Sequence, residues 1–250
     1  MSEYPVSVRN LTMAHGDNVV QRDITFDVNK GEVMVVMGES GCGKSTLLRH
    51  LIGLNEPAAG QVLRNGIDLW NCSDDVHDGI LRSSGILYQG GALWTSMTLE
   101  ENVSLPLVQF TTYDKRTIHD IAEYKLSLVG LSGCGGLYPS EISGGMRKRA
   151  GLARAMALDP DVLFFDEPSA GLDPLSSRRL DELILELRES LGTTLIVITH
   201  ELASIFTIAN TSIYLDAETK TMVAWGDPRV LRESCENEKV RRFLNSGGKL

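Results

Sequence analysis

A glycine-rich segment between a strand pattern and a helix pattern constrains this chain most. Residues 38–45, GESGCGKS, match the pattern G-x-x-x-x-G-K-[ST] at every position. Residues 32–37 form a short apolar run typical of a buried parallel strand, and residues 46–52 continue as a helical pattern. Strand, loop and helix in this order predict an α/β fold that binds a nucleoside triphosphate. A chance glycine-rich turn is disfavoured because both flanking elements are present.

Each type of residue in this loop has an expected task. Gly38, Gly41 and Gly43 let the backbone fold back, so that N–H groups point at phosphate oxygens beside the positive end of the next helix. We expect Lys44 to reach the β- and γ-phosphates and the Ser45 hydroxyl to bind Mg²⁺. The expected nucleotide-binding residues of the loop are Gly38, Glu39, Ser40, Gly41, Cys42, Gly43, Lys44, Ser45 and Thr46.

A second apolar run, residues 162–165, ends in the acidic pair Asp166-Glu167. In open α/β sheets ligands bind at the carboxyl ends of the strands. We therefore expect Asp166 to hold Mg²⁺, through water, and Glu167 to orient and deprotonate the attacking water. The alternative is a solvated strand end, which the upstream phosphate loop makes less favoured.

Two further apolar runs, residues 85–88 and 194–199, deliver Gln89 and His200 at their ends. If these runs are strands of the same sheet, both side chains face the same pocket. We expect His200 to contact the γ-phosphate and the water, and the Gln89 amide to contact Mg²⁺ and the water. A surface glutamine and a structural histidine remain the alternatives.

Two segments further along resemble motifs of the ATP-binding subunits of ABC transporters. Residues 142–146, ISGGM, resemble the signature motif of that family, and residues 169–174, SAGLDP, resemble its D-loop. The resemblance implies a homodimer that closes on ATP, with the signature of one copy over the nucleotide held by the other. The residues that it places at the nucleotide are Ser143, Gly144, Gly145 and Asp173. Ser143 and the glycines also precede an apparent helix, whose N-terminus offers donors to a phosphate.

The resemblance also implies a fold and an activity. The fold is a RecA-like phosphate-loop NTPase core with an antiparallel β region and an inserted α-helical subdomain. The activity is ATP hydrolysis with Mg²⁺. Where many members stack an aromatic residue on adenine, this chain has His15, so the purine preference stays open between ATP and GTP. Met146 replaces the more usual glutamine of the signature, which leaves the contact in trans to Ser143 and the glycine N–H groups.

The match narrows to one branch of the family. Residues 87–99, 143–154 and 241–244 are similar to the ATPase subunits of Mla/MCE-type lipid transporters. This similarity implies a multi-span permease and an MCE-type lipid-binding protein as partners. It also implies a cytoplasmic chain held by the permease on the inner face of the cell membrane. An ATPase of a small-solute importer and a soluble ABC protein outside transport are the alternatives.

Composition limits the other classes of function. The formal net charge of −9 and the pI near 5.1 argue against broad nucleic-acid binding. The four cysteines form no C-x-x-C pair and are expected to be reduced thiols. No apolar run approaches the roughly 20 residues that span a bilayer, so any membrane role is expected through a partner.

The expected organisation is one ABC ATPase domain over residues 1–250. Residues 1–88 and 161–225 would form the core, residues 89–160 the helical subdomain with the signature, and residues 226–250 a helical tail. Whether the tail packs on its own chain or contacts a second copy stays open. Asp173 and the following proline predict a helix start. The apolar face of that helix is expected to comprise Leu180, Leu183, Ile184, Leu187 and Leu191.

Two segments have two interpretations each. Residues 92–99 place Trp94 and other apolar groups in a loop, for packing between subdomains or for a groove that receives a permease helix. Arg147, Lys148 and Arg149 lie in the first turn of the signature helix, where positive charge opposes the helix dipole. They form either a solvated basic face or a contact with an anion or acidic partner.

Overall fold

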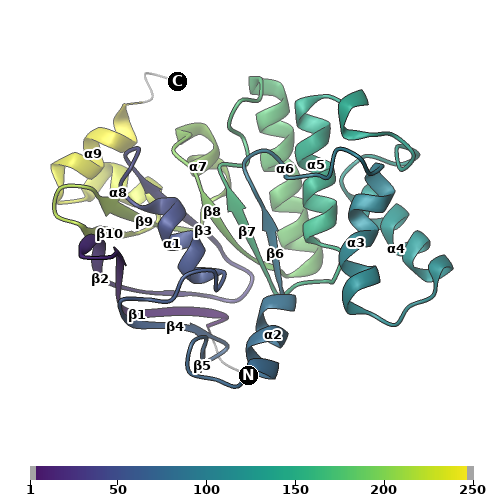
Figure 1. Ribbon diagram of the computed structural model, residues 1–250. Coiled ribbons are helices and arrows are strands. Elements are labelled where there is room, and N and C mark those ends of the chain that lie inside the picture. Colours follow the sequence, from purple (N-terminus) through teal and green to yellow (C-terminus); the bar gives the residue numbers. More distant parts are fainter. Residues whose placement is uncertain (1–3, 247–250) are drawn as a thin grey trace.

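The computed structural model describes residues 4–246, which build two sheets surrounded by helices (Figure 1). The smaller sheet is antiparallel and has the strand order β2-β1-β4-β5. The larger sheet has the order β10-β9-β3-β8-β7-β6 and is parallel except for β10. The smaller sheet contains β1 (Val6–His15), β2 (Asn18–Val28), β4 (Ala59–Arg64) and β5 (Ile67–Asp68). The larger sheet contains β3 (Val33–Gly38), β6 (Ser84–Leu87), β7 (Val162–Asp166), β8 (Thr194–Ile198), β9 (Thr211–Asp216) and β10 (Thr221–Gly226).

The helices divide into groups around these sheets. Three helices of the middle of the chain lie together at one side of the larger sheet (Figure 1, teal), and two short helices end the described chain. The middle group is α3 (Leu99–Phe110), α4 (Lys115–Leu128) and α5 (Gly144–Ala155), with a short 3₁₀ helix, Pro139–Glu141. The others are α1 (Lys44–Leu51), α2 (Asp74–Arg82), α6 (Pro174–Leu191), α7 (Leu202–Ile208), α8 (Pro228–Ser234) and α9 (Glu238–Asn245).

The larger sheet separates two apolar layers. Successive side chains of a strand point to opposite faces, and every residue of β3 is buried. Met34 and Val36 belong to the layer shared with α1 and the antiparallel sheet. Val33, Val35 and Met37 belong to the layer shared with α3 to α6. A phosphate-loop core with an antiparallel β region and an α-helical subdomain, the fold class predicted from the sequence, is confirmed.

The predicted strands end where a site can form. Strand β7 runs beside β8 in parallel register, with Asp166 opposite Ile198, and β3 pairs with β8 through Val36 and Ile198. The carboxyl ends of these strands therefore meet at one edge of the sheet. The observed bounds differ from the predicted apolar runs by one residue for β3, β6, β7 and β8, and α1 begins two residues earlier than predicted.

Helix α6 follows its predicted start but not the whole of its predicted apolar face. The Asp173 carboxylate accepts hydrogen bonds from the N–H groups of Leu175 and Ser176, and Gly192 ends the helix with φ +65°. Four of the five predicted residues are buried, but Leu191 is 44% exposed. The inclusion of Leu191 is wrong because residues 189–192 are all exposed, so the apolar stripe outlasts the surface on which α6 packs.

Candidate functional site

A cavity of about 870 Å³ opens at the carboxyl ends of the strands. It gathers most of the side chains that the sequence places at a nucleotide, from segments far apart in the chain. Its predicted lining residues are His15, Gly38, Glu39, Ser40, Gly41, Gly43, Lys44, Ser45, Thr46, Gln89, Glu167 and His200. Three residues that the sequence does not predict complete the lining: Val20, Phe243 and Ser246.

The glycine-rich loop wraps around the side chain of Lys44 and binds it through main-chain carbonyl oxygens. The backbone has φ +80° at Gly41 and +103° at Gly43, values that glycine adopts without strain. Lys44 is buried, and its Nζ donates to the carbonyl oxygens of Gly38 and Glu39, each at 2.9 Å. The loop therefore presents a cation and a helix N-terminus to the cavity, a combination that fits a phosphate chain.

Cys42 is buried. It is the one loop residue of the predicted set that does not line the cavity. Its Sγ lies 4.0 Å from Lys44 Nζ. Burial raises the pKa of this thiol, which keeps it in the neutral form. All four cysteines are free thiols, as the sequence predicts. Cys42 is thus a packing residue of the loop in this structure.

Two oxygen atoms that could hold a divalent cation lie next to each other, one on Ser45 of the cavity lining and one on Asp166, which is not itself a lining residue. Ser45 Oγ donates to Asp166 Oδ1 at 3.5 Å. Burial, followed by the charge of Glu167, raises the pKa of Asp166. A bound cation would favour the ionised carboxylate, and hydroxyl and carboxylate oxygens are ligands that suit Mg²⁺. Gln89, exposed at the wall of the same cavity, adds an amide oxygen.

Glu167 and His200 form a directly bonded pair. His200 Nδ1 lies 2.9 Å from Glu167 Oε1, and with the proton on that nitrogen the imidazole donates to the carboxylate. Glu167 has φ +49°, an uncommon value for this residue type, and its N–H donates to Ile198 O at 2.9 Å. Its second oxygen, Oε2, is buried and has no hydrogen-bond partner within residues 4–246. His200 thus fixes one oxygen of Glu167, and the other is buried without a hydrogen bond from the described part of the chain.

The residues that resemble the signature and D-loop lie elsewhere. Ser143 caps α5, its Oγ accepting from Met146 N at 3.2 Å, and Asp173 caps α6. Gly145 lies against α6, since a Cβ added there would be 3.5 Å from Ser176 Oγ. In the described part of the chain, Ser143, Gly144, Gly145 and Asp173 do not line the cavity. One copy of the chain therefore does not bring its two sets of predicted nucleotide contacts together.

The three basic residues near the start of α5 bind main-chain carbonyl oxygens. Lys148 is only 6% exposed, and its Nζ donates to Pro168 O and Ala170 O, each at 2.6 Å. Arg147 and Arg149 donate to Ile142 O at 3.0 Å and Val129 O at 2.8 Å. A solvated basic face is therefore wrong for Lys148, because this side chain connects α5 to the segment directly after Glu167.

The loop after Gln89 both packs inward and exposes an aromatic ring. Leu99 is fully buried and Trp94 is 58% exposed. Asn102, buried at the start of α3, accepts from Trp94 N and donates to the carbonyl oxygens of Trp94, Met97 and Thr98. Arg154 donates to Gly91 O and Ala92 O. The loop is therefore an ordered turn that presents Trp94 outward.

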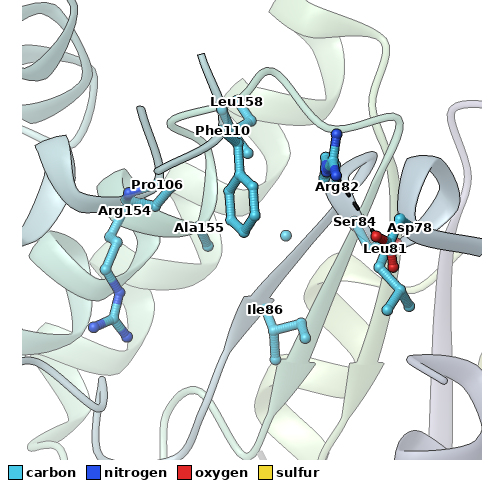
Figure 2. Close-up of a pocket in the computed structure, with 11 residues that line it drawn as sticks. Asp78, Leu81, Arg82, Ser84, Ile86, Pro106, Phe110, Arg154, Ala155 and Leu158 are labelled. Atoms are coloured by element: carbon cyan, nitrogen blue, oxygen red, sulfur yellow. Dashed lines mark ion pairs between the residues drawn. The ribbon is translucent and has the colours of Figure 1, made fainter. Parts of the chain in front are cut away.

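A second cavity, of about 330 Å³, lies where β6, α2, α3 and α5 meet, and Arg154, which donates to the loop carbonyls, is one of its lining residues. Figure 2 shows the Phe110 ring pointing into it above Ile86. The Arg82 guanidinium lies 5.3 Å from the centre of that ring, and Arg82 also forms an ion pair with Asp78 at 3.7 Å. The cavity is thus apolar at its centre and charged at its rim.

The sequence offers little signal for the unpredicted lining residues. Val20 lies on a strand, where its apolar side chain indicates burial and nothing more. Phe243 and Ser246 come from the helical tail, whose apolar positions predict packing without a target. Their place in the cavity is a product of the tertiary structure alone.

The family model described as ABC transporter matches residues 21–170. The probable ribonucleotide transport ATP-binding protein mkl of Mycobacterium leprae is 41% identical over 96% of this chain, which spans 68% of that protein. The intermembrane phospholipid transport system ATP-binding protein MlaF of Haemophilus influenzae is 38% identical over 98% of this chain and 91% of its own length.

Solved structures give the same fold. CbiO1 from Clostridium perfringens, part of the ABC transporter complex cbiONQ, matches with a TM-score of 0.85 and 25% identity, over 98% of this chain and 96% of that one. The ATP-binding cassette MJ0796, in a dimeric post-hydrolysis state with ADP and Pi, matches with a TM-score of 0.79 and 27% identity, over 89% of this chain and 98% of that one.

Proposed function

The chain belongs to the ABC transporter family, and from this premise we propose that it is the ATP-hydrolysing subunit of a membrane transporter for phospholipid or a related lipid. One observation carries the enzymatic part of the proposal. A single cavity joins the phosphate loop with Lys44 to the bonded pair of Glu167 and His200. A phosphate-binding loop beside a carboxylate that a histidine holds in place is suited to the attack of water on a terminal phosphate.

Each of these residues has a proposed role. Lys44 and the loop N–H groups bind the phosphates, and His15 lies against the base. Ser45, Gln89 and Asp166 hold Mg²⁺, which, when bound, neutralises charge on the phosphates. His200 fixes Glu167 through Nδ1 and contacts the γ-phosphate, while the Glu167 carboxylate orients the water and accepts its proton. All of these groups come from one copy of the chain.

The second copy supplies the rest of the site. Ser143, Gly144, Gly145 and Asp173 are available on α5 and at the start of α6 but lie outside their own chain's cavity. We propose that they contact the nucleotide held by the partner, with the N-terminus of α5 directed at its phosphates. The dimeric state of the similar cassette MJ0796 supports this arrangement.

Glutamine in place of Glu167 tests the hydrolytic role. The amide keeps the size of the side chain but does not accept the proton of water, so turnover should fall by about 10²–10⁴-fold. ATP binding should remain. Steady-state phosphate release and equilibrium binding measure the two effects, and ordinary turnover by Glu167→Gln would remove this residue from the role of general base.

Two observations support the lipid branch of the proposal: the similarity to the MlaF relatives, and an apolar surface at the cavity that Figure 2 shows. Relatives named for intermembrane phospholipid transport match nearly the whole chain. Across residues 4–246 no helix is long and apolar enough to cross a bilayer. We propose that a multi-span permease holds the chain on the inner face of the membrane, with an MCE-type protein as a further partner. The apolar cavity around Phe110 and the exposed Trp94 offer a contact for a permease helix.

The second candidate function is also ATP hydrolysis in a transporter, but with a small solute as the transported substrate. The mycobacterial relatives carry a name that refers to ribonucleotide transport, and they are at least as similar as the MlaF relatives. The chain would then energise an importer of a small solute. Purification of the complex in mild detergent, with its proteins and lipids identified by mass spectrometry, decides between them. A permease with an MCE protein and enriched phospholipid supports the lipid branch, and a permease with neither supports the solute branch.

A further inference from the structure

The C-terminal helix α9 reaches the nucleotide cavity of its own chain. Phe243 on this helix and Ser246 after it line the cavity together with the phosphate loop. Figure 1 shows α9 (yellow) beside the loop that leads into α1. Phe243 is only partly buried in the apolar core, so part of its ring faces the cavity. A large aromatic side chain is thus exposed to any ligand in this site.

Helix α9 is held firmly in this position. Val240 and Leu244 are buried in the core, and the Phe243 ring meets the edge of Tyr214 with centroids 5.3 Å apart. Lys239 Nζ donates to Asp216 Oδ1 at 2.6 Å and lies 4.0 Å from Glu39 Oε2 of the phosphate loop. The hydrogen bond to Asp216 raises the pKa of Lys239, so the ammonium stays charged at neutral pH. Packing and charge together fix the ring.

The same end of the sheet carries His15. The turn between β9 and β10 connects helix α9 to the β1–β2 hairpin. The Lys220 side chain in this turn donates to Val19 O at 2.7 Å, and the Lys220 carbonyl oxygen accepts from Arg22 N at 2.9 Å. That turn also bears Glu218, which lies 3.4 Å from Lys239 Nζ. The tip of the β1–β2 hairpin and helix α9 are therefore tied to one turn, and both contribute walls to the cavity above the phosphate loop.

We propose that Phe243 contacts the base or sugar of the bound nucleotide and sets part of the affinity of the site. The imidazole of His15 offers a smaller stacking face than the aromatic residue common at that position, and Phe243 provides a second aromatic face from a different part of the chain. Every nucleobase has a π-face, so an aromatic ring stabilises it regardless of its hydrogen-bond pattern. This inference rests on the proposed nucleotide site and assigns it one further contact residue.

Binding measurements on two ligands separate this contact from a general disturbance of the loop. In the Glu167→Gln background, isothermal titration with Mg²⁺-ATP and with Mg²⁺-tripolyphosphate compares a ligand that has base and sugar with one that lacks both. Phe243→Ala should raise the Kd for ATP by about five- to tenfold and leave the Kd for tripolyphosphate within about twofold. Phe243→Tyr should restore ATP affinity, because it keeps the ring. Arg242→Ala, a change at the exposed neighbouring position, should alter neither Kd.

The outcomes distinguish this inference from the nucleotide site itself. Lys44→Ala should abolish binding of both ligands. If Lys44→Ala binds normally, the assignment of the phosphate loop fails, and the inference fails with it. If Lys44→Ala fails to bind while Phe243→Ala binds ATP as tightly as its parent, only the contact by Phe243 is overturned. Equal weakening of ATP and tripolyphosphate by Phe243→Ala would also overturn it, because the ring would then act through the loop.

Discussion

A buried carboxylate in α6 gives a stability prediction with a sharp dependence on pH. Asp181 is only 4% exposed, and its Oδ2 accepts from Ser204 Oγ on α7 at 2.9 Å. Its Oδ1 is buried without a hydrogen-bond partner among the described residues. Burial is the largest cause that raises the pKa of this group to about 6, and the charges of Glu201 and Glu182 add to it. Ionised Asp181 is therefore unfavourable in the folded chain.

The magnitude follows from the two pKa values. The folded state holds the proton with a pKa of about 6 and the ordinary value is 3.8. At about 1.4 kcal/mol for each pH unit, the difference corresponds to about 3 kcal/mol. Because the folded pKa is raised, this stabilising contribution is complete below pH 3.8 and is lost as pH rises through 6. At pH 7.5 the folded chain lacks it fully, and at pH 5 it regains about 1.4 kcal/mol.

Asp181→Asn removes the titration. The amide NH₂ group at the position of Oδ1 would be buried without an acceptor, at a cost of about 1–3 kcal/mol that does not vary with pH. The net effect at one pH is therefore small, and the change with pH is the test. Relative to the parent, Asp181→Asn should be more stable at pH 7.5 than at pH 5 by about 1.4 kcal/mol.

Urea unfolding followed by circular dichroism, at both pH values, measures this difference. The matched control is Glu186→Gln, which removes an exposed carboxylate from the same helix without touching the charges that act on Asp181. Its stability relative to the parent should change by less than about 0.5 kcal/mol between the two pH values. A free-energy difference for Asp181→Asn that is constant from pH 5 to 7.5 would refute the assignment of a raised pKa to Asp181.

Two further predictions concern the supports of the site. Lys148→Met removes both hydrogen bonds to Pro168 O and Ala170 O, so the segment after Glu167 should lose its position. We expect kcat to fall by about tenfold with little change in the KM for ATP. Lys148→Arg should recover part of kcat. An unchanged kcat in steady-state assays would limit Lys148 to packing. Asn102→Ala removes four hydrogen bonds that order the loop at Trp94, so limited proteolysis should cut residues 92–98 faster while ATP binding persists. Unaltered cleavage of this loop would show that other contacts hold it.

The core of the site could be predicted because strand patterns and motifs are local. The apolar runs at residues 162–165 and 194–199 became β7 and β8, and their parallel register puts Asp166 and His200 at one edge. The phosphate loop required only its own spacing and the flanking strand and helix. Local periodicity and the rule that ligands bind at strand ends were sufficient for these residues.

Other features depend on contacts that leave no local pattern. The partners of Lys148 are main-chain carbonyls, which exist at every residue and have no sequence signature. The apolar pattern that includes Phe243 predicts an amphipathic helix, but it does not indicate which surface the helix covers. Leu191 fits the stripe of α6, yet the helix extends beyond its packing surface. Each of these depends on the tertiary arrangement of elements distant in the sequence.

The central claim is that each nucleotide site is completed by the partner copy, and occupancy in mixed dimers tests it most directly. Dimers with two tags are purified in the Glu167→Gln background, with Lys44→Ala in one copy and Ser143→Arg in the other, and the trapped ATP per dimer is counted. Completion in trans leaves one intact site, formed by Lys44 of the second copy and Ser143 of the first. The account therefore predicts one trapped ATP per dimer for this pair. It predicts none when one copy carries both changes and the other carries neither. The reverse result, none for the first pair and one for the second, would contradict it.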